Sequence, residues 1–155
     1  MPSTTVVQRL YDAFQARDGQ AMADCYAPDA AFRDEVFDLA GRAKIGAMWK
    51  MLIERGTDLQ LVVRDVVEDD TTGSAHWQAT YTFTTTGRKV CNEIDAAMRI
   101  EDGQIVEHRD RFDFWRWSRQ ALGPVGWVLG WSPVVRGKVQ AEARKGLDAW
   151  IADHA

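Results

Sequence analysis

The stretch that decides the fold is Gln104-Ile-Val-Glu-His-Arg-Asp-Arg-Phe-Asp-Phe114. Its residues fall into two alternating sets. One set holds Glu107, Arg109, Arg111 and Asp113, and the other holds Val106, His108, Asp110, Phe112 and Phe114. Because a β-strand sends alternate side chains to opposite faces, this pattern predicts a strand with one charged face and one apolar face. His108 and Asp110 then lie on the apolar face.

A carboxylate among aromatic residues needs a partner, because an unpaired buried carboxylate is strongly destabilising. We therefore expect Asp110 either to be paired or to line a cavity. The candidate partners are His108 and an arginine such as Arg33. A histidine and a carboxylate beside a cavity can transfer protons, whereas a histidine on an apolar face can also be a hydrogen-bonded core residue.

Two further alternating segments precede this strand. Residues 75–83 place Trp77 and Tyr81 on one face, and residues 90–100 place Asn92 on an apolar face. The turn Glu101-Asp102-Gly103 joins the second of them to the opening strand as a hairpin. Residues 59–68 are rich in β-branched residues and predict another strand.

The first third of the chain is predicted to be mainly helical. Apolar residues recur at spacings of three and four, which predicts helices ending near residue 18, over about 20–26 and over about 42–55. Trp49 lies on the apolar stripe of the third helix, and a short extended segment runs through residues 30–34. Helices followed by long strands predict an α+β domain. We expect three N-terminal helices laid against a curved antiparallel sheet that encloses a cone, a cystatin-like α+β barrel.

The composition of the chain bears on its number of domains, its binding partners and its location in the cell. The chain has 155 residues, of which 46% are hydrophobic and 27% charged, enough for one domain with a sizeable core. A net charge of -4 without a dense Lys/Arg block argues against nucleic acid as a partner. The two cysteines fit neither a disulfide framework nor a zinc motif. Without a signal-peptide pattern or a long apolar run at the start, we expect a cytoplasmic protein.

The tail is rich in tryptophan. Four of the seven tryptophans are Trp115, Trp117, Trp127 and Trp131, and residues 121–131 carry no charge. We expect a domain over residues 1–118 and a tail over 119–155, an apolar loop followed by a helix from about Pro133. The tail can cap the open end of the cone, pack on a second subunit or lie on a membrane. Acidic residues in its helix argue against the membrane, so we expect a cap or a homodimer.

Three motifs carry a resemblance to a known family. They are Asp24-Cys-Tyr-Ala-Pro-Asp-Ala-Ala-Phe-Arg-Asp34, Gly41-Arg42 before a helix, and the hairpin Met98-Arg-Ile-Glu-Asp-Gly-Gln-Ile105. Together they resemble the nuclear transport factor 2-like superfamily, and within it the SnoaL-like group, over about residues 4–114. Its members include steroid isomerases, epoxide hydrolases, polyketide cyclases and non-catalytic binding or transport proteins, so the resemblance implies a fold more than an activity.

Two branches of the family suggest site residues. Asp34 matches the catalytic base of ketosteroid isomerases, but their helix-1 tyrosine falls on Leu10 and their oxyanion-hole aspartic acid on Ala96. Asp110 matches one aspartate of the triad of limonene epoxide hydrolases. That branch needs an arginine and an aspartate two apart on the strand over residues 77–83, where this chain offers Trp77, Ala79 and Tyr81 on the inward face. The resemblance therefore implies acid/base residues without the full machinery of either branch.

These observations predict an apolar pocket with Asp34, His108 and Asp110 as catalytic residues. Its other expected ligand-binding residues are Trp49, Trp77, Tyr81, Asn92 and Phe112. The expected ligand is a small hydrophobic carbonyl or epoxide compound, and the alternative is a non-catalytic binding protein. No cofactor is expected. A metal held by His108, Asp110 and Asp34 is a weaker alternative.

Overall fold

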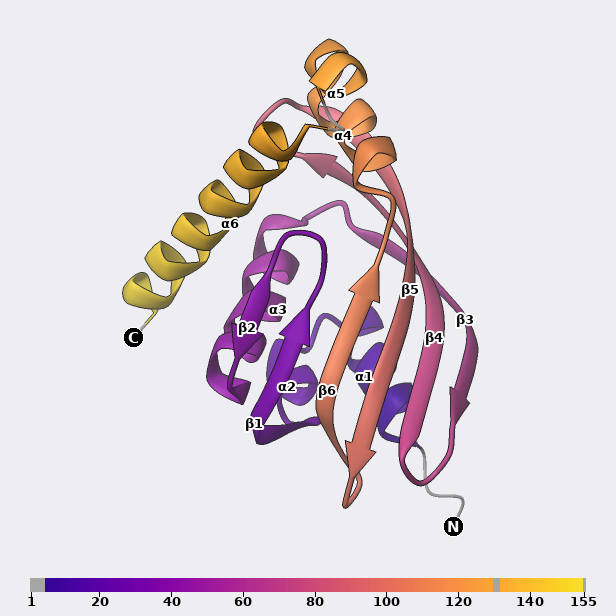
Figure 1. Cartoon of the computed structure of the whole chain (residues 1–155). Helices are drawn as coiled ribbons and strands as arrows, with labels where there is room; N and C mark the ends of the chain where they lie inside the picture. The colour runs from indigo at the N-terminus through magenta and orange to yellow at the C-terminus, as the bar shows by residue number, and fades with distance from the viewer. Residues whose placement is uncertain (1–4, 130–131, 155) are drawn as a thin grey trace.

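A curved sheet wraps around three helices, with its concave side facing them (Figure 1). The structure, a computed structural model, describes residues 5–129 and 132–154. The strands of the sheet are β1 (Tyr26–Arg33), β2 (Asp38–Ala40), β3 (Gln60–Glu68), β4 (Thr72–Phe83), β5 (Arg88–Glu101) and β6 (Gln104–Arg111). The helices are α1 (Val6–Gln15), α2 (Gly19–Ala23), α3 (Arg42–Arg55), α4 (Phe114–Leu122), α5 (Pro124–Leu129) and α6 (Pro133–Asp153).

The six strands lie in the order β2-β1-β6-β5-β4-β3. The expected α+β class and curved sheet are confirmed, and the sheet does not close, so β2 and β3 form its edges. One pairing differs from the expected antiparallel arrangement, because β1 pairs with β6 in parallel, with Phe32 opposite His108. Parallel neighbours need a long connection, and everything between β1 and β6 serves as that connection.

The helices follow the spacing of their apolar residues. The α1 N-cap is Thr5, whose side chain accepts a hydrogen bond from the Gln8 backbone N–H. The third helix has the bounds that the sequence predicts, Arg42–Arg55. It packs closely on α2 because Gly46 has no side chain. A Cβ at Gly46 would lie 2.7 Å from the Cβ of Ala23.

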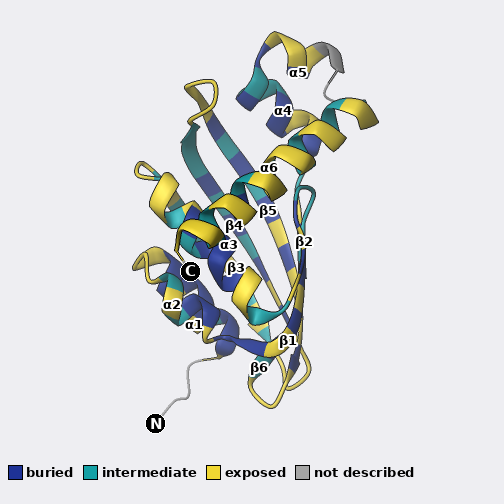
Figure 2. Cartoon of the chain, turned by 90° about the vertical axis from the view of Figure 1, so that its left-hand side faces the viewer, coloured by how far each residue is buried: buried dark blue, intermediate teal, exposed yellow. Residues whose placement is uncertain are grey.

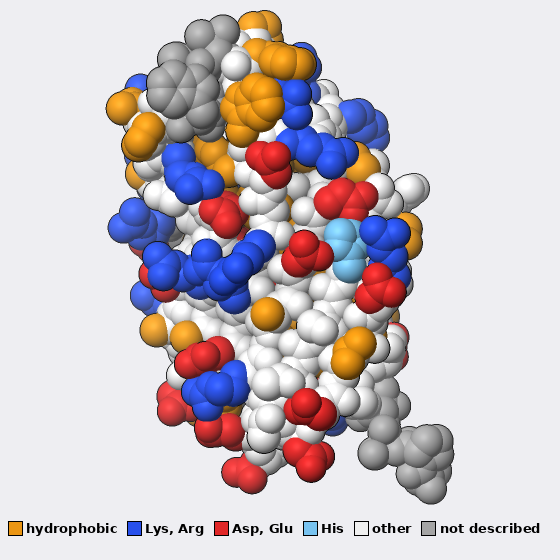
Figure 3. Space-filling model, turned by 45° about the vertical axis from the view of Figure 1, so that its right-hand side comes forward, with side chains coloured by type: hydrophobic (Ala, Val, Ile, Leu, Met, Phe, Trp, Pro, Cys, Tyr) orange, Lys and Arg blue, Asp and Glu red, His pale blue; other side chains and the backbone are white. Residues whose placement is uncertain are grey.

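Most of the core lies between the concave face of the sheet and α1 to α3 (Figure 2). The predicted face of β5 is buried, and Asn92 is among its buried residues. On β6, His108 and Asp110 are buried while Glu107 and Arg111 are exposed, which confirms the predicted alternation. The outer face of the sheet carries charged side chains of both signs (Figure 3). On it, His76 lies between Asp95 and Glu93, which raise its pKa.

The segment expected to be an apolar loop is largely helical. It forms the end of α4 and all of α5, and the expected boundary at residue 118 falls inside α4. The buried face of α4 contributes Phe114, Trp117 and Ala121 to a second, smaller hydrophobic cluster with Val90. Trp131 lies outside the described residues.

The last helix packs on its own chain, running from α5 down to α3 (Figures 1 and 2). Arg136 of α6 forms an ion pair with Glu35 at 2.8 Å, and the Trp150 indole N–H donates to Glu54 at 2.9 Å. Leu147 is the buried residue of α6, at 1% exposure. None of the described helices combines the length and apolar character needed to cross a membrane.

Candidate functional site

A histidine–aspartate pair lies on the concave face of β6. The His108 Nε2 atom is 2.7 Å from Asp110 Oδ1, and each residue is 2% exposed. The two side chains are neighbours because residues two apart on a strand share a face. Asp110 is therefore paired with His108. The alternative partner, Arg33, is wrong: it lies on the exposed side of β1 with its guanidinium 3.9 Å from Asp38.

Tyr26 holds the other side of the imidazole. Its hydroxyl lies 2.7 Å from His108 Nδ1 and accepts a hydrogen bond from the Trp49 indole N–H at 3.1 Å. Since the indole can only donate, the tyrosine hydroxyl is free to donate its own hydrogen to Nδ1. Nε2 then carries the imidazole hydrogen and donates it to Asp110. The hydrogen bonds thus run without a break from Trp49 through Tyr26 and His108 to Asp110.

Aromatic rings enclose the imidazole. Phe32 meets the His108 ring edge-on at 4.9 Å between centroids, and Trp49 stacks over it at 6.2 Å. Burial raises the pKa of Tyr26, and the negative charge of Asp110 raises it further. The Tyr26 hydroxyl therefore keeps its proton at neutral pH. Sequence analysis missed Tyr26 because it places this residue at the end of the predicted helix over about 20–26, whereas α2 ends at Ala23 and Tyr26 begins β1.

Asp34 lies at the end of β1, in the turn to β2. Its Oδ1 atom accepts hydrogen bonds from the backbone N–H groups of Val36 at 2.7 Å and Phe37 at 2.6 Å. Its Oδ2 atom makes no hydrogen bond with any described residue, and the side chain is only partly exposed. Burial raises the pKa of Asp34 to about 7, despite the two backbone hydrogen bonds, and the charge of Asp110 adds to the rise. Asp34 is thus both a turn residue and a carboxyl group whose pKa lies near neutral pH.

Two buried donors in the same interior have no partner. Within the described part of the chain, neither the Tyr11 hydroxyl nor the Trp77 indole N–H finds an acceptor. Burial raises the pKa of Tyr11, and the nearby charge of Asp110 contributes, so this hydroxyl stays protonated. Because buried donors are almost always satisfied in proteins, these two mark places where a ligand or a water molecule would bind.

The sequence did not point to Tyr11, because the tyrosine position of the ketosteroid isomerases falls one residue earlier, on Leu10. Both residues of α1 are buried, but only Tyr11 brings a hydroxyl. The buried face of α1 is wide enough to include both positions. A donor from the first helix is therefore present after all, although not at the matching position.

The remaining expected residues are spread over the interior. Tyr81 accepts a hydrogen bond from the Trp117 indole N–H at 2.8 Å, which links the sheet to α4. Asn92 is buried and makes no side-chain hydrogen bond with the described residues. Phe112 is half-buried and packs against both hydrophobic clusters. The predicted residues thus come from the concave side or the rim of the sheet, apart from Trp49, which comes from α3.

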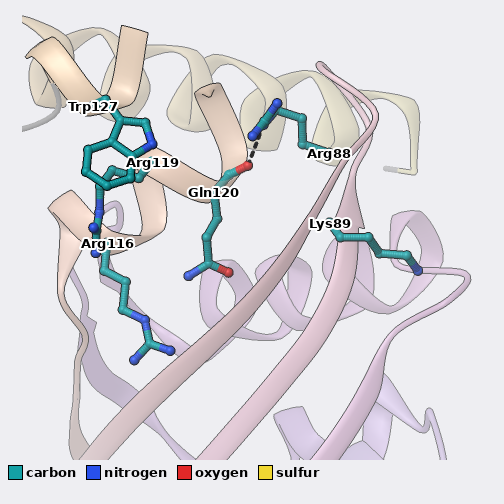
Figure 4. A pocket seen from close by; sticks show the side chains of 6 residues that line it. All are labelled: Arg88, Lys89, Arg116, Arg119, Gln120 and Trp127. Carbon is teal, nitrogen blue, oxygen red and sulfur yellow. Dashed lines mark hydrogen bonds between the residues drawn. The ribbon is translucent and has the colours of Figure 1, made fainter. Parts of the chain in front are cut away.

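Among the hollows formed by the described residues, two stand out, and neither is lined by Asp34, His108 or Asp110. One is lined by residues of α1 and β3, among them Phe14 and Leu61. The other lies between α4, α5 and the start of β5 (Figure 4). Among the residues described, no group of three metal-binding side chains converges. Both ring nitrogens of His108 are also engaged, which leaves none for a metal.

Comparison with protein families identifies the domain. The model of the SnoaL-like domain matches residues 7–108, more than half of the chain. The chain belongs to the SnoaL-like family. The match to the SnoaL-like domain ends at His108, so Asp110 and the tail lie beyond it. No curated protein is significantly similar in sequence.

Solved structures share the SnoaL-like fold at low sequence identity. A protein from Catenulispora acidiphila with a ketosteroid isomerase-like fold, solved with trimethylamine, has a TM-score of 0.66 and 15% identity, over 80% of this chain and 98% of that one. A candidate SnoaL-like polyketide cyclase from Jannaschia has a TM-score of 0.65 and 18% identity, over 77% and 90%. A candidate polyketide cyclase from Xanthomonas campestris has a TM-score of 0.61 and 23% identity, over 74% and 93%. At these identities the SnoaL-like fold is what is shared.

Proposed function

We propose that this SnoaL-like protein is an acid/base enzyme that acts on a small hydrophobic carbonyl or epoxide compound bound in its interior. The observation that carries the proposal is Asp34, a partly exposed carboxyl with a pKa raised to about 7 and one oxygen without a partner among the described residues. A carboxyl of this kind is present in both protonation states near neutral pH. General acid/base catalysis needs such a group.

The surrounding donors and acceptors complement a carbonyl substrate. Asp34 Oδ2 would take a proton from the carbon next to the carbonyl and return it at another carbon. The developing negative charge on the substrate oxygen needs a hydrogen-bond donor, and Tyr11 and Trp77 each offer one that no described residue accepts. Apolar side chains fill the rest of the interior, which favours a hydrophobic substrate.

The His108–Asp110 pair has a different role in this proposal. Because both residues are deeply buried and His108 is hydrogen-bonded on both sides, the pair holds the charge of Asp110 close to Asp34 and Tyr11, and Asp110 raises the pKa of Asp34 more than His108 lowers it. That charge helps to keep Asp34 protonated until substrate arrives. His108 and Asp110 then act on the reaction through the pKa of Asp34 as well as by any direct contact with substrate.

Proton exchange tests the proposal without knowledge of the natural substrate. A panel of apolar ketones is incubated with the protein in D₂O, and loss of the α-proton signal is followed by NMR. We expect accelerated exchange for at least one compound, rising with pH through about 7 because the base form of Asp34 is required. Epoxide opening is measured in parallel by mass spectrometry.

Asp34→Asn is the decisive variant, because its amide oxygen can still accept the two backbone hydrogen bonds of the turn. We expect it to lower the exchange rate by about 100-fold or more, the usual contribution of a general base. Asp38→Asn, at an exposed position on the adjacent strand, is the matched control and should change nothing. Equal rates for the wild type and Asp34→Asn would refute the proposal.

A non-catalytic binding protein is the second candidate. It is favoured by the completeness of the hydrogen bonds from Trp49 through Tyr26 to Asp110, which resemble a structural network as much as a reactive one. In that case a ketone or epoxide would bind, and Asp34→Asn would leave its affinity intact. No reaction would accompany binding.

A further inference from the structure

The second place of chemical interest lies outside the interior, where α4 and α5 meet the start of β5. A groove of about 600 Å³ opens there (Figure 4). It is lined by Arg88, Lys89, Arg116, Arg119, Gln120 and Trp127. Four of its six lining residues are therefore cationic, and none is acidic.

The groove is separate from the interior because the two use opposite faces of α4. Phe114, Trp117 and Ala121 face the second hydrophobic cluster. Arg116 and Arg119, three residues apart, line the groove instead. Residues three or four apart share a helix face, so α4 presents one apolar side and one basic side.

Three arginines in the groove lack a carboxylate partner. Lys89 forms an ion pair with Asp58 at 3.1 Å, but no described Asp or Glu lies within ion-pair distance of Arg88, Arg116 or Arg119. Arg116 makes no side-chain hydrogen bond with the described residues, and the buried Nε of Arg119 has no acceptor among them. Like charges gathered this way repel one another, and a bound anion would relieve the repulsion.

Two side chains of the groove are held in place by the protein. The Arg119 guanidinium lies over the rings of Trp115 and Trp127, 4.0 Å and 4.6 Å from their centroids. Arg88 Nε donates to the backbone oxygen of Gln120 at 2.8 Å. Fixed arginines bind oxyanions well because little side-chain freedom is lost on binding. Trp127 is still 58% exposed, which leaves aromatic surface free beside the cations.

We propose that this groove binds a small planar aromatic oxyanion, a carboxylate or phosphate ester attached to a ring. The acidic group would bind Arg116, and the ring would pack against Trp127, which lies on the same side of the groove (Figure 4). The groove is too small for a folded partner and too localised for a polyanion, since the protein as a whole carries a net charge of -4. The proposal does not depend on the chemistry of the interior.

Calorimetric titration and NMR test the proposal with four probes: 1-naphthoate, 1-naphthyl phosphate, uncharged 1-naphthol and inorganic phosphate. We expect the two naphthyl anions to bind at least about tenfold more tightly than 1-naphthol or inorganic phosphate. Binding should shift the indole N–H signal of Trp127 and leave that of the interior Trp77 in place. The better of the two naphthyl anions identifies the acid group.

Arg116→Gln is the main variant because this side chain makes no contact on which folding depends. We expect about tenfold weaker binding, the effect of losing one charge-assisted contact. Arg144→Gln removes an equal charge from the exposed face of α6 and should leave the affinity within about twofold. Equal losses in the two variants, equal affinity for 1-naphthol, or equal affinity for inorganic phosphate would overturn the proposal. Tighter binding of a single-stranded oligonucleotide, or no binding of either naphthyl anion at millimolar concentration, would also overturn it.

Discussion

At the scale of single residues, two tyrosines of the interior differ in one respect. The Tyr26 hydroxyl joins Trp49 to His108, whereas the Tyr11 hydroxyl has no partner among the described residues. Both rings are buried, so both contribute apolar area to the core. Comparing the two tyrosines therefore measures how much the hydrogen bonds of the Tyr26 hydroxyl contribute to stability.

Tyr26→Phe removes a hydroxyl that two buried groups need. We expect it to lower the free energy of unfolding by about 1–3 kcal/mol, because the Trp49 indole N–H and His108 Nδ1 lose their partner. Tyr11→Phe should be neutral or slightly stabilising, because it removes a buried polar group without a partner. Urea unfolding of both variants measures the contrast. Equal destabilisation would contradict the network.

Asp34 should make stability fall as pH rises. Its pKa is raised to about 7 in the folded protein, so between about pH 4 and 7 the unfolded chain releases this proton while the folded protein retains it. The contribution of Asp34 to stability is therefore fully present below about pH 4 and is lost as the pH rises to about 7. Between pH 5 and pH 8, the free energy of unfolding of Asp34→Asn should rise by roughly 2 kcal/mol relative to that of the wild type.

Urea unfolding at the two pH values measures this gain. The comparison cancels His76, whose raised pKa also makes stability fall with pH, because both proteins carry it. A constant difference between the wild type and Asp34→Asn would show that the carboxyl titrates normally.

The residues that sequence analysis found and missed differ in a physical way. His108 and Asp110 stand out because polar residues on the apolar parity of a strand are rare. Tyr26 and Tyr11 do not stand out, because a tyrosine in a core position has the same pattern as any other hydrophobic residue. Only the three-dimensional contacts show that one hydroxyl has two partners and the other none.

At the scale of elements, the packing of α2 on α3 depends on a glycine. Gly46→Ala would place a methyl group 2.7 Å from the Cβ of Ala23, too close for two carbon atoms. We expect the two helices to shift and the free energy of unfolding to fall by about 1–3 kcal/mol. Thermal unfolding measures the loss.

Gly137→Ala is the matched control, since Gly137 also lies inside a helix and has no atom within 4 Å of the added Cβ. At this position only the higher helix propensity of alanine acts, and we expect the free energy of unfolding to rise by about 0.5–1 kcal/mol. If Gly137→Ala is destabilised as Gly46→Ala is, α6 has another contact at this position. If Gly46→Ala is stabilised as Gly137→Ala is, α2 moves freely.

Elements were predictable where one local signal dominated. The bounds of α3 follow from its apolar stripe and from Gly56 behind it, and the alternation in β4 and β5 follows from burial of one face. The parallel pairing of β1 was not predictable, because nothing local specifies which strand lies beside it. The helix α5 was not predicted because its segment lacks charge, so no polar face marks a helical period, whereas α4 has a basic face formed by Arg116 and Arg119.

At the scale of the whole molecule, the tail and the SnoaL-like domain are in contact through α6. Leu147 is 1% exposed, so Leu147→Ala should leave a cavity and cost about 2–4 kcal/mol. Val134→Ala, at a position on the same helix with 67% exposure, should change stability by less than about 0.5 kcal/mol.

Tryptophan fluorescence and far-UV circular dichroism should report one coincident transition in Leu147→Ala, shifted to lower temperature. A separate early transition with an unshifted main one would mean that the tail folds independently. The homodimer and the cytoplasmic location stay predictions, and sedimentation velocity tests the first of them.

The placement of β6 between β1 and β5 also governs how the protein is made. Tyr26 leaves the ribosome 82 residues before its partner His108. Until β6 emerges, β1 and β5 both present unpaired edges, the kind of surface on which nascent chains aggregate or are captured by chaperones. A chain that stops before Gln104 lacks the one strand that joins the two parts of the sheet. The protein therefore completes its sheet and forms the Tyr26–His108 hydrogen bond in the same late step of synthesis.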